Sequence, residues 1–148
     1  MAPLNPDLAG RVFPPTNYLV GREKIREFAR AVRSTNPLHH DVEASRAAGF
    51  PDVVAPPTFS TVVLGPAVTQ LMESPGTGIE LHRVVHGSEK IEYRRPIVAG
   101  DDLSTTLTIV DVSERAGNSF LSTICEVCDE TGALVATVTS SFLHRGDA

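Results

Sequence analysis

The stretch STNPLHHD, in the first third of the chain, contains the residues best suited to acid–base chemistry. Asn36 and Pro37 form a turn signal, and His39, His40 and Asp41 follow directly. An imidazole titrates near neutral pH, and a nearby carboxylate can orient its ring, so this composition is typical of a general acid–base site. It is equally compatible with a solvated loop that has no catalytic role. His39 is therefore the candidate base, with Asp41 as its candidate partner.

Two other pairs of residues have the side-chain types that bind metals, but their spacing argues against a site. Cys125 and Cys128 lie in a stretch with strand periodicity, where side chains three apart point to opposite faces, so neither a disulfide nor a shared metal is favoured. His82 and His86 are four apart, which suits a metal on a helix but not at the start of a strand. We therefore predict neither a metal nor a cofactor.

Helical patterns flank the histidine-containing stretch on both sides. An amphipathic helix is predicted from Arg22 to before Asn36-Pro37, because a proline disfavours helical geometry at the preceding residue. A second, short helix is predicted after Asp41, which would cap it, and before Gly49, which would end it. The first helix has apolar residues at helical spacing, namely Ile25, Phe28, Ala29 and Val32.

The rest of the chain combines one very apolar helix with several strands. Residues 58–72 are apolar nearly all round, which predicts a helix buried on every side. From Ile91 onward the pattern alternates with a period of two, and turn residues separate the segments, which predicts an antiparallel meander of four or five strands. A short extended piece is expected near Tyr18. A sheet curled around the helix gives one α+β domain spanning 1–148, and its open edge favours a dimer.

Composition and charge limit the classes of function. The chain is 41% hydrophobic and 21% charged, which is ordinary for a globular domain. A formal net charge of −5 argues against nucleic-acid binding, which requires clustered Lys and Arg. No apolar run approaches the length of a membrane span, and the N-terminus lacks the pattern of a signal peptide, so we expect a cytoplasmic protein that does not bind membranes.

Four segments resemble one known family: VGREKIREFARAV, FPDVVAPPTF, RVVHGSEKIEYRRPIVAGDDL and GALVATVTSSF. Together with the N-P-x-H loop, they resemble the MaoC-type (R)-specific enoyl hydratases and (3R)-hydroxyacyl-thioester dehydratases. The closest likeness is to the small actinobacterial dehydratase subunits of the FAS1-like type. The resemblance implies a hot-dog fold and an acyl-CoA or acyl-carrier-protein thioester as ligand. It also implies a homodimer, or a heterodimer with a catalytic MaoC-type subunit.

The first signature of active family members is D-x-N-P-x-H, in which the aspartate and histidine move the protons of the reaction. This chain matches it at Asn36, Pro37 and His39, but Ser34 stands at the aspartate position. Serine cannot act as a carboxylate base. Asp41 is the available acidic residue that could replace it.

The second family signature is A-x-G at the start of the central helix, where the glycine amide polarises the thioester carbonyl. Ala55 matches, but Pro57 stands at the glycine position and has no N–H to donate. The amide of Thr58, one residue later, could replace it if the register slips. Phe59 and Val62 belong either to the core or to the lining of an acyl tunnel, and both remain candidate substrate contacts.

The leading hypothesis is therefore an acyl-binding, scaffolding subunit of a (3R)-hydroxyacyl-thioester dehydratase, with a degenerate site and a catalytic partner. A self-sufficient hydratase using His39 and Asp41 is the main alternative. A thioesterase would need a carboxylate near the central helix, where the sequence offers only Glu73 at its far end. A nonenzymatic acyl-binding protein is the remaining class. Basic residues of the first helix either steer an acidic carrier protein or are simply solvated: Arg22, Lys24, Arg26, Arg30 and Arg33.

Overall fold

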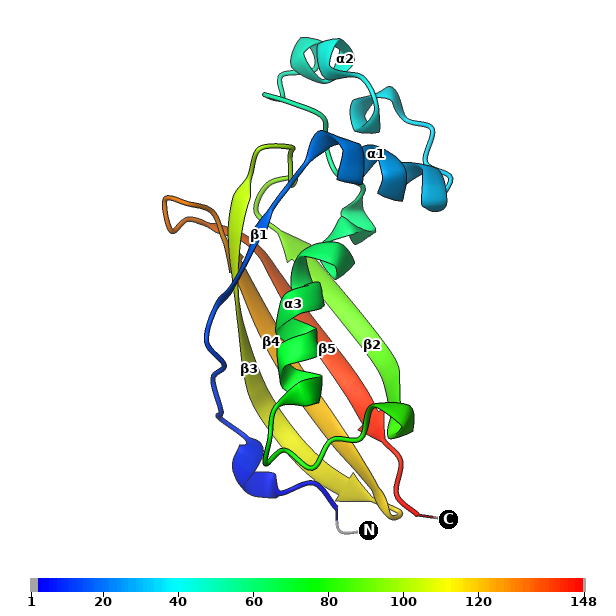
Figure 1. Ribbon diagram of the computed structural model, residues 1–148, viewed down its shortest axis with the longest axis vertical. Helices are drawn as coiled ribbons and strands as arrows, with labels where there is room; N and C mark the ends of the chain where they lie inside the picture. The colour runs from blue at the N-terminus through cyan, green and yellow to red at the C-terminus, as the bar shows by residue number, and fades with distance from the viewer. Residues whose placement is uncertain (1–2, 148) are drawn as a thin grey trace.

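The computed structural model describes residues 3–147, which form an antiparallel five-stranded sheet with a long helix, α3, packed lengthwise on one face (Figure 1). The expected α+β architecture is confirmed. The strands are β1 (Thr16–Leu19), β2 (Val84–Tyr93), β3 (Asp102–Arg115), β4 (Asn118–Cys128) and β5 (Leu134–His144). The helices are α1 (Arg22–Ala31), α2 (Val42–Ala47) and α3 (Ser60–Glu73), and a 3-10 turn, Pro57–Phe59, leads into α3.

The two helices around the histidine-containing stretch form where the sequence predicts them. In α1, Ile25 and Ala29 are fully buried, as expected from the apolar stripe, whereas Val32 follows the end of the helix and is exposed. The side chain of Asp41 caps α2 by accepting hydrogen bonds from the first free backbone amides of that helix. Gly49 follows α2 with a φ of +96°, the left-handed conformation that glycine adopts most easily.

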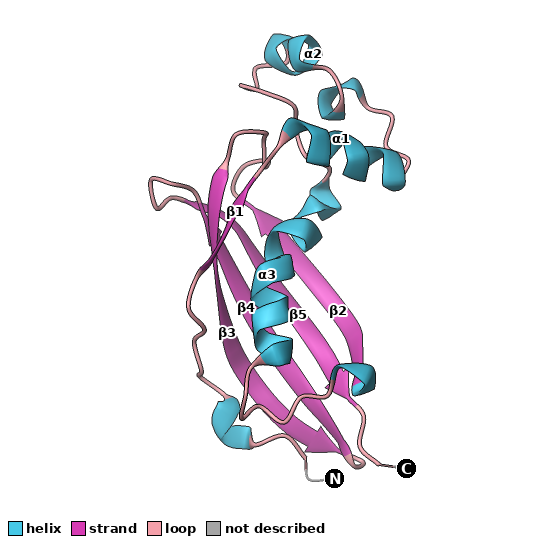
Figure 2. Cartoon of the chain, viewed as in Figure 1, coloured by secondary structure: helices cyan, strands magenta, loops and turns pink. Residues whose placement is uncertain are grey.

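The order of strands in the sheet is β1-β3-β4-β5-β2, which a simple meander does not give (Figure 2). Strands β3, β4 and β5 are consecutive neighbours, but β2 pairs with β5 instead of β3. The segment 94–101 therefore carries the chain from the end of β2 past two strands to β3. This crossing leaves β2 as an edge strand, with one side unpaired within the described residues.

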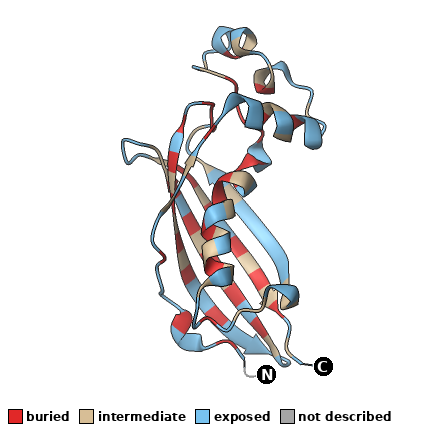
Figure 3. Cartoon of the chain, viewed as in Figure 1, coloured by how far each residue is buried: buried red, intermediate tan, exposed pale blue. Residues whose placement is uncertain are grey.

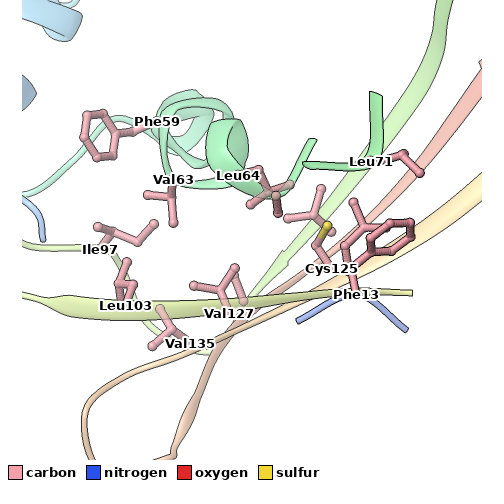
Figure 4. Packing of buried hydrophobic residues seen from close by; sticks show 14 of the residues in the cluster. Phe13, Phe59, Val63, Leu64, Leu71, Ile97, Leu103, Cys125, Val127 and Val135 are labelled. Carbon is pink, nitrogen blue, oxygen red and sulfur yellow. The ribbon is translucent and has the colours of Figure 1, made fainter. Parts of the chain in front are cut away.

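The hydrophobic core lies between α3 and the sheet. Val63 and Leu64 of α3 point toward the side of the core that holds Val127 and Val135 (Figure 4), and Leu71 belongs to the same buried cluster. The expectation that α3 is buried on every side is wrong for the single chain, because one sheet covers only one side of a helix. The outer side is open to solvent (Figure 3), with four exposed residues: Thr61, Pro66, Thr69 and Glu73.

Helices α1 and α2 form a separate cap beyond the N-terminal end of α3 (Figure 1). The ring of Phe28 in α1 meets the ring of Phe59 edge-on, with centroids 5.4 Å apart. This contact joins the cap to the start of α3, and it places the histidine-containing loop beside the N-terminus of the central helix. Among the described residues, no helix is long and apolar enough to cross a membrane.

Candidate functional site

The loop before α2 holds His39 in a fixed place. Asn36 begins a 3-10 turn, Pro37–His39, and its side chain accepts a hydrogen bond from the Leu38 amide at 3.0 Å. Pro37 suits the first position of such a turn because that position needs no N–H donor. The His39 amide then donates to the Asn36 carbonyl at 3.0 Å, which closes the turn. His39 ends the turn with only 8% of its surface exposed.

The imidazole of His39 is oriented by the backbone. Its Nδ1 lies 2.6 Å from the carbonyl oxygen of Val54. A carbonyl oxygen only accepts hydrogen bonds, so Nδ1 must carry the proton. In the neutral ring Nε2 is then the unprotonated nitrogen, and no described residue is bonded to it. His39 is therefore in the tautomer that a general base requires.

A cavity of about 460 Å³ opens beside this ring. This volume is within the usual range for small-molecule sites. Three segments meet around it: the histidine loop, residues 54–57, and the segment that follows β2. Backbone hydrogen bonds join them, from Val54 to the Leu38 carbonyl and from Ala55 to the Ile97 carbonyl, both at 2.8 Å. The lining residues are Asn36, His39, Val54, Ala55, Pro56, Pro57, Tyr93, Arg94, Arg95, Pro96 and Ile97.

The charged groups that line this pocket are basic. Arg95 binds both carboxylate oxygens of Asp101, at 2.8 and 3.0 Å, so its charge is largely balanced. Arg94 is exposed, and no described carboxylate pairs with it. None of the described lining residues is an aspartate or a glutamate. The pocket therefore offers a base and positive charge, but no second acid–base group of the carboxylate type.

The two candidates for a carboxylate position lie elsewhere. Asp41 uses its Oδ1 to cap α2, accepting from the Glu43 amide at 2.8 Å and the Ala44 amide at 3.2 Å, and it does not line the pocket. The carbonyl oxygen of Ser34 lies 2.8 Å from Nε2 of His40, so His40 braces the loop. Neither Ser34 nor Asp41 lines the pocket, and among the described residues no hydrogen bond joins either of them to the ring of His39.

The start of the central helix also departs from the expected arrangement. Pro57 lines the pocket but has no N–H, and its carbonyl accepts a hydrogen bond from the hydroxyl of Tyr93. Thr58 is exposed and does not line the pocket. Phe59 is fully buried in the core. Val62 is partly buried and packs against the core. Of the candidate ligand contacts, the structure brings only Asn36 and Ala55 to the pocket with His39.

The remaining chemistry-bearing residues lie away from this pocket. Glu73 is the exposed last residue of α3. Cys125 and Cys128 are both free, and burial raises the pKa of Cys125 to about 12, so its thiol stays protonated and unreactive at neutral pH. His82 lies in a 3-10 turn before β2, whereas His86 lies on β2, so the two do not share an element.

The sequence patterns missed the contribution of the end of β2 and the segment after it, which bring Tyr93, Arg95 and Ile97 to the pocket. Tyr93 reaches a residue 36 positions earlier, and no local spacing signals such a contact. One signal was present. Tyr93 is an aromatic residue at the end of its strand, directly before a loop with two arginines and a proline, and loops often carry binding residues.

Comparisons with known proteins agree with this geometry. A family described as the FAS1-like, dehydratase domain region matches residues 7–138. A UPF0336 protein of Clavibacter michiganensis subsp. michiganensis is 52% identical over 146 residues, covering 98% of each chain. These matches confirm the expected resemblance.

Two solved structures are similar along most of the chain. One is the C-terminally truncated HadBC (3R-hydroxyacyl-ACP dehydratase) complex from Mycobacterium tuberculosis, with a TM-score of 0.84 and 29% identity, covering 93% of this chain and 97% of that one. The other is a MaoC-like dehydratase, with a TM-score of 0.82 and 31% identity, covering 93% of this chain and 42% of that one. The expected hot-dog fold is confirmed.

Proposed function

Because this chain belongs to the FAS1-like dehydratase domain family, we propose that it is the acyl-thioester-binding subunit of a (3R)-3-hydroxyacyl-thioester dehydratase, the same reaction that in reverse is enoyl-thioester hydration. The observation that carries the proposal is the pocket of His39. It keeps an oriented imidazole, but no described carboxylate lines it, and residue 57 has no amide hydrogen. Full catalysis then needs a partner subunit.

The chemistry explains why one histidine is not enough. Dehydration removes a proton from the carbon next to the thioester carbonyl and a hydroxyl from the following carbon. It therefore needs a base for the proton, an acid for the departing hydroxyl, and a donor for the negative charge on the carbonyl oxygen. In this pocket His39 can serve as the base. The Val54 carbonyl orients the imidazole but cannot itself act as an acid.

We propose that a partner subunit supplies a full set of catalytic residues in its own pocket, so that turnover does not depend on His39. Two features of the single chain support this: the unpaired edge of β2 and the open outer side of α3. Pairing through β2 would extend the sheet across two subunits and cover the exposed edge. The HadBC dehydratase, whose structure this chain resembles, is itself a complex. We propose a heterodimer with a catalytic MaoC-type subunit, although a homodimer would use the same edge.

The hydration of crotonyl-CoA tests the proposal, because the loss of enoyl-thioester absorbance follows it directly. The purified chain alone should show negligible turnover, while the complex with a MaoC-type subunit from the same source should be active. The change His39→Ala in this chain should leave turnover by the complex within about twofold, since the base used in turnover is the partner's. The change His82→Ala, at an exposed position outside the pocket, is the matched control.

A self-sufficient hydratase is the second candidate, and the tautomer imposed on His39 by Val54 favours it. It predicts robust turnover by the chain alone, abolished by His39→Ala and unaffected by His82→Ala. That result would replace the proposal of a degenerate subunit. Binding of crotonyl-CoA without turnover, even with the partner present, would instead identify a nonenzymatic acyl-binding protein.

The acyl group would arrive on CoA or on an acyl carrier protein. Carrier proteins are acidic, and α1 has a basic face close to the pocket loop, since Arg26 donates a hydrogen bond to the His40 carbonyl at 2.9 Å. We propose this face as the place where a carrier protein would dock.

A further inference from the structure

Position 57 lies at the mouth of the pocket but has no hydrogen to donate, because it is a proline. A different hydrogen-bond donor reaches the same residue. The hydroxyl of Tyr93, at the end of β2, donates a hydrogen bond to the carbonyl oxygen of Pro57. Both residues line the cavity beside His39. A movable O–H is thus bonded to the same residue whose fixed amide N–H is missing.

The environment of Tyr93 keeps this donor protonated. Burial raises the pKa of the phenol, and hydrogen bonding by Ser60, the first residue of α3, offsets this only in part. The hydroxyl is therefore neutral throughout the physiological range. A neutral tyrosine hydroxyl is one of the side chains that enzymes use to bind a carbonyl oxygen that gains negative charge.

The present hydrogen bond of Tyr93 does not prevent such a role. The phenol proton can turn about the bond between the ring and the oxygen, away from Pro57 and toward a ligand. Pro57 is exposed, so water can take over the hydrogen bond to its carbonyl and no unpaired buried group is left behind.

We propose that Tyr93 is a carbonyl-binding residue of this pocket, whose hydroxyl donates a hydrogen bond to the carbonyl oxygen of an acyl thioester in place of the absent amide of residue 57. This inference rests on the proposed function, because it requires that the pocket binds a thioester. It does not require turnover. The alternative is that Tyr93 only ties the end of β2 to the start of α3.

Absorption spectroscopy of bound 2,4-hexadienoyl-CoA separates these roles. Polarisation of the thioester carbonyl of this conjugated ligand shifts its absorption to longer wavelength. Wild-type protein should therefore shift the band on binding. The change Tyr93→Phe should remove most of the shift and weaken binding by only about threefold to tenfold, the usual effect of one hydrogen bond. Isotope-edited infrared spectra of the carbonyl stretch should show the same loss.

The matched control is Tyr18→Phe, which removes the hydroxyl of the other tyrosine in the chain. Tyr18 is also half-buried and contacts Phe59, with ring centroids 6.3 Å apart, but it does not line the pocket. This variant should keep the full shift. A shift retained in Tyr93→Phe, or wild-type binding with no shift at all, would overturn the role of Tyr93 and leave the proposed function standing. Failure of wild-type protein to bind the ligand would overturn both.

A second measurement covers the case in which Tyr93→Phe does not fold. Incorporation of 3-fluorotyrosine into the Tyr18→Phe variant labels Tyr93 alone. Fluorine makes the phenol a stronger hydrogen-bond donor without removing its contact to Pro57. The absorption shift should then increase, and an unchanged shift would overturn the inference.

Discussion

The chemistry of the pocket depends on what stands beside a single imidazole. The Val54 carbonyl and a carboxylate both hold Nδ1 in its protonated form, so either fixes the tautomer of His39. They differ once the ring takes up a second proton. A carboxylate stabilises the resulting imidazolium with a full negative charge, whereas a carbonyl offers only a partial one. The Val54 carbonyl therefore fixes the orientation and tautomer of His39 without supplying the full counter-charge of a catalytic carboxylate, which fits a subunit that binds more than it catalyses.

Asp41 is the residue whose two possible roles are most easily separated. As the cap of α2, it should be replaceable by Asn, because both residues cap helices well, while Asp41→Ala should lower the free energy of unfolding by about 1 kcal/mol. Urea unfolding measures both effects. If Asp41 instead assists His39, then Asp41→Asn should abolish hydration while leaving stability unchanged. We expect Asp41→Asn to match wild type in both measurements.

At the scale of elements, local patterns predicted most of what the structure contains. The apolar stripe predicted α1, the Asp41 cap and Gly49 predicted α2, and alternation predicted β3, β4 and β5, but not the part of β2 before Ile91. These signals lie within one element, where side-chain spacing fixes which face is buried. The place of β2 beside β5 was not predictable in the same way, since pairing between distant strands leaves no local pattern. The same limit applied to the site. The His39 loop is one continuous stretch and could be predicted, whereas Tyr93 reaches Pro57 from another element and could not.

One contact between distant elements makes the stability of the fold depend on pH. Nε2 of His144, at the end of β5, accepts a hydrogen bond at 3.0 Å from the Glu80 amide, just before the 3-10 turn Leu81–Arg83. Accepting it requires a neutral ring. Burial lowers the pKa of His144 below its usual 6.5, and the nearby Arg83 and His82 act in the same direction, while Glu80 opposes them.

The sign of the pH effect follows from that shift. Below pH 6.5 the unfolded chain binds a proton at His144 more readily than the folded chain does, so protonation favours unfolding. The stability that His144 contributes should be complete above pH 6.5 and should fall as the pH drops through the lowered pKa. The change His144→Gln, which keeps an acceptor that cannot be protonated there, should flatten the pH dependence of the unfolding midpoint below pH 6.5. The control His86→Gln, at an exposed histidine that is not among the groups shifting the pKa of His144, should keep it, and an equal flattening in both variants would contradict the assignment.

On the scale of the whole molecule, the two ends of α3 have different roles. The cap of α1 and α2 lies at one end, with the pocket loop, and the first and last described residues lie at the other end with the β3–β4 turn (Figure 1). Along the sheet, the edge strand β2 and the open side of α3 are both uncovered in the single chain. A partner along this length would leave the α1 end accessible, so subunit pairing and carrier docking would not compete for the same surface.

Carrier docking at α1 depends on the basic residues whose charge is not already neutralised. Arg22, Lys24 and Arg26 each pair with a carboxylate. No described residue forms an ion pair with Arg30 or Arg33, and Arg33 has a φ of +59°, a conformation that is costly for any residue except glycine. The free charge of this face therefore lies at the C-terminal end of α1, next to the pocket loop.

Reversal of the charges of Arg30 and Arg33 should weaken binding of an acyl carrier protein without affecting the binding of acyl-CoA. We expect Arg30→Glu with Arg33→Glu to reduce carrier binding by roughly fivefold to tenfold at low salt, because exposed charge pairs contribute about 0.5 kcal/mol or more each. Titration calorimetry at increasing salt concentrations should show the difference disappearing as screening grows. The matched control, Arg115→Glu with Arg145→Glu, makes the same change of net charge at the far end of the molecule. An equal loss in the control would mean that net charge, and not the face of α1, governs the encounter.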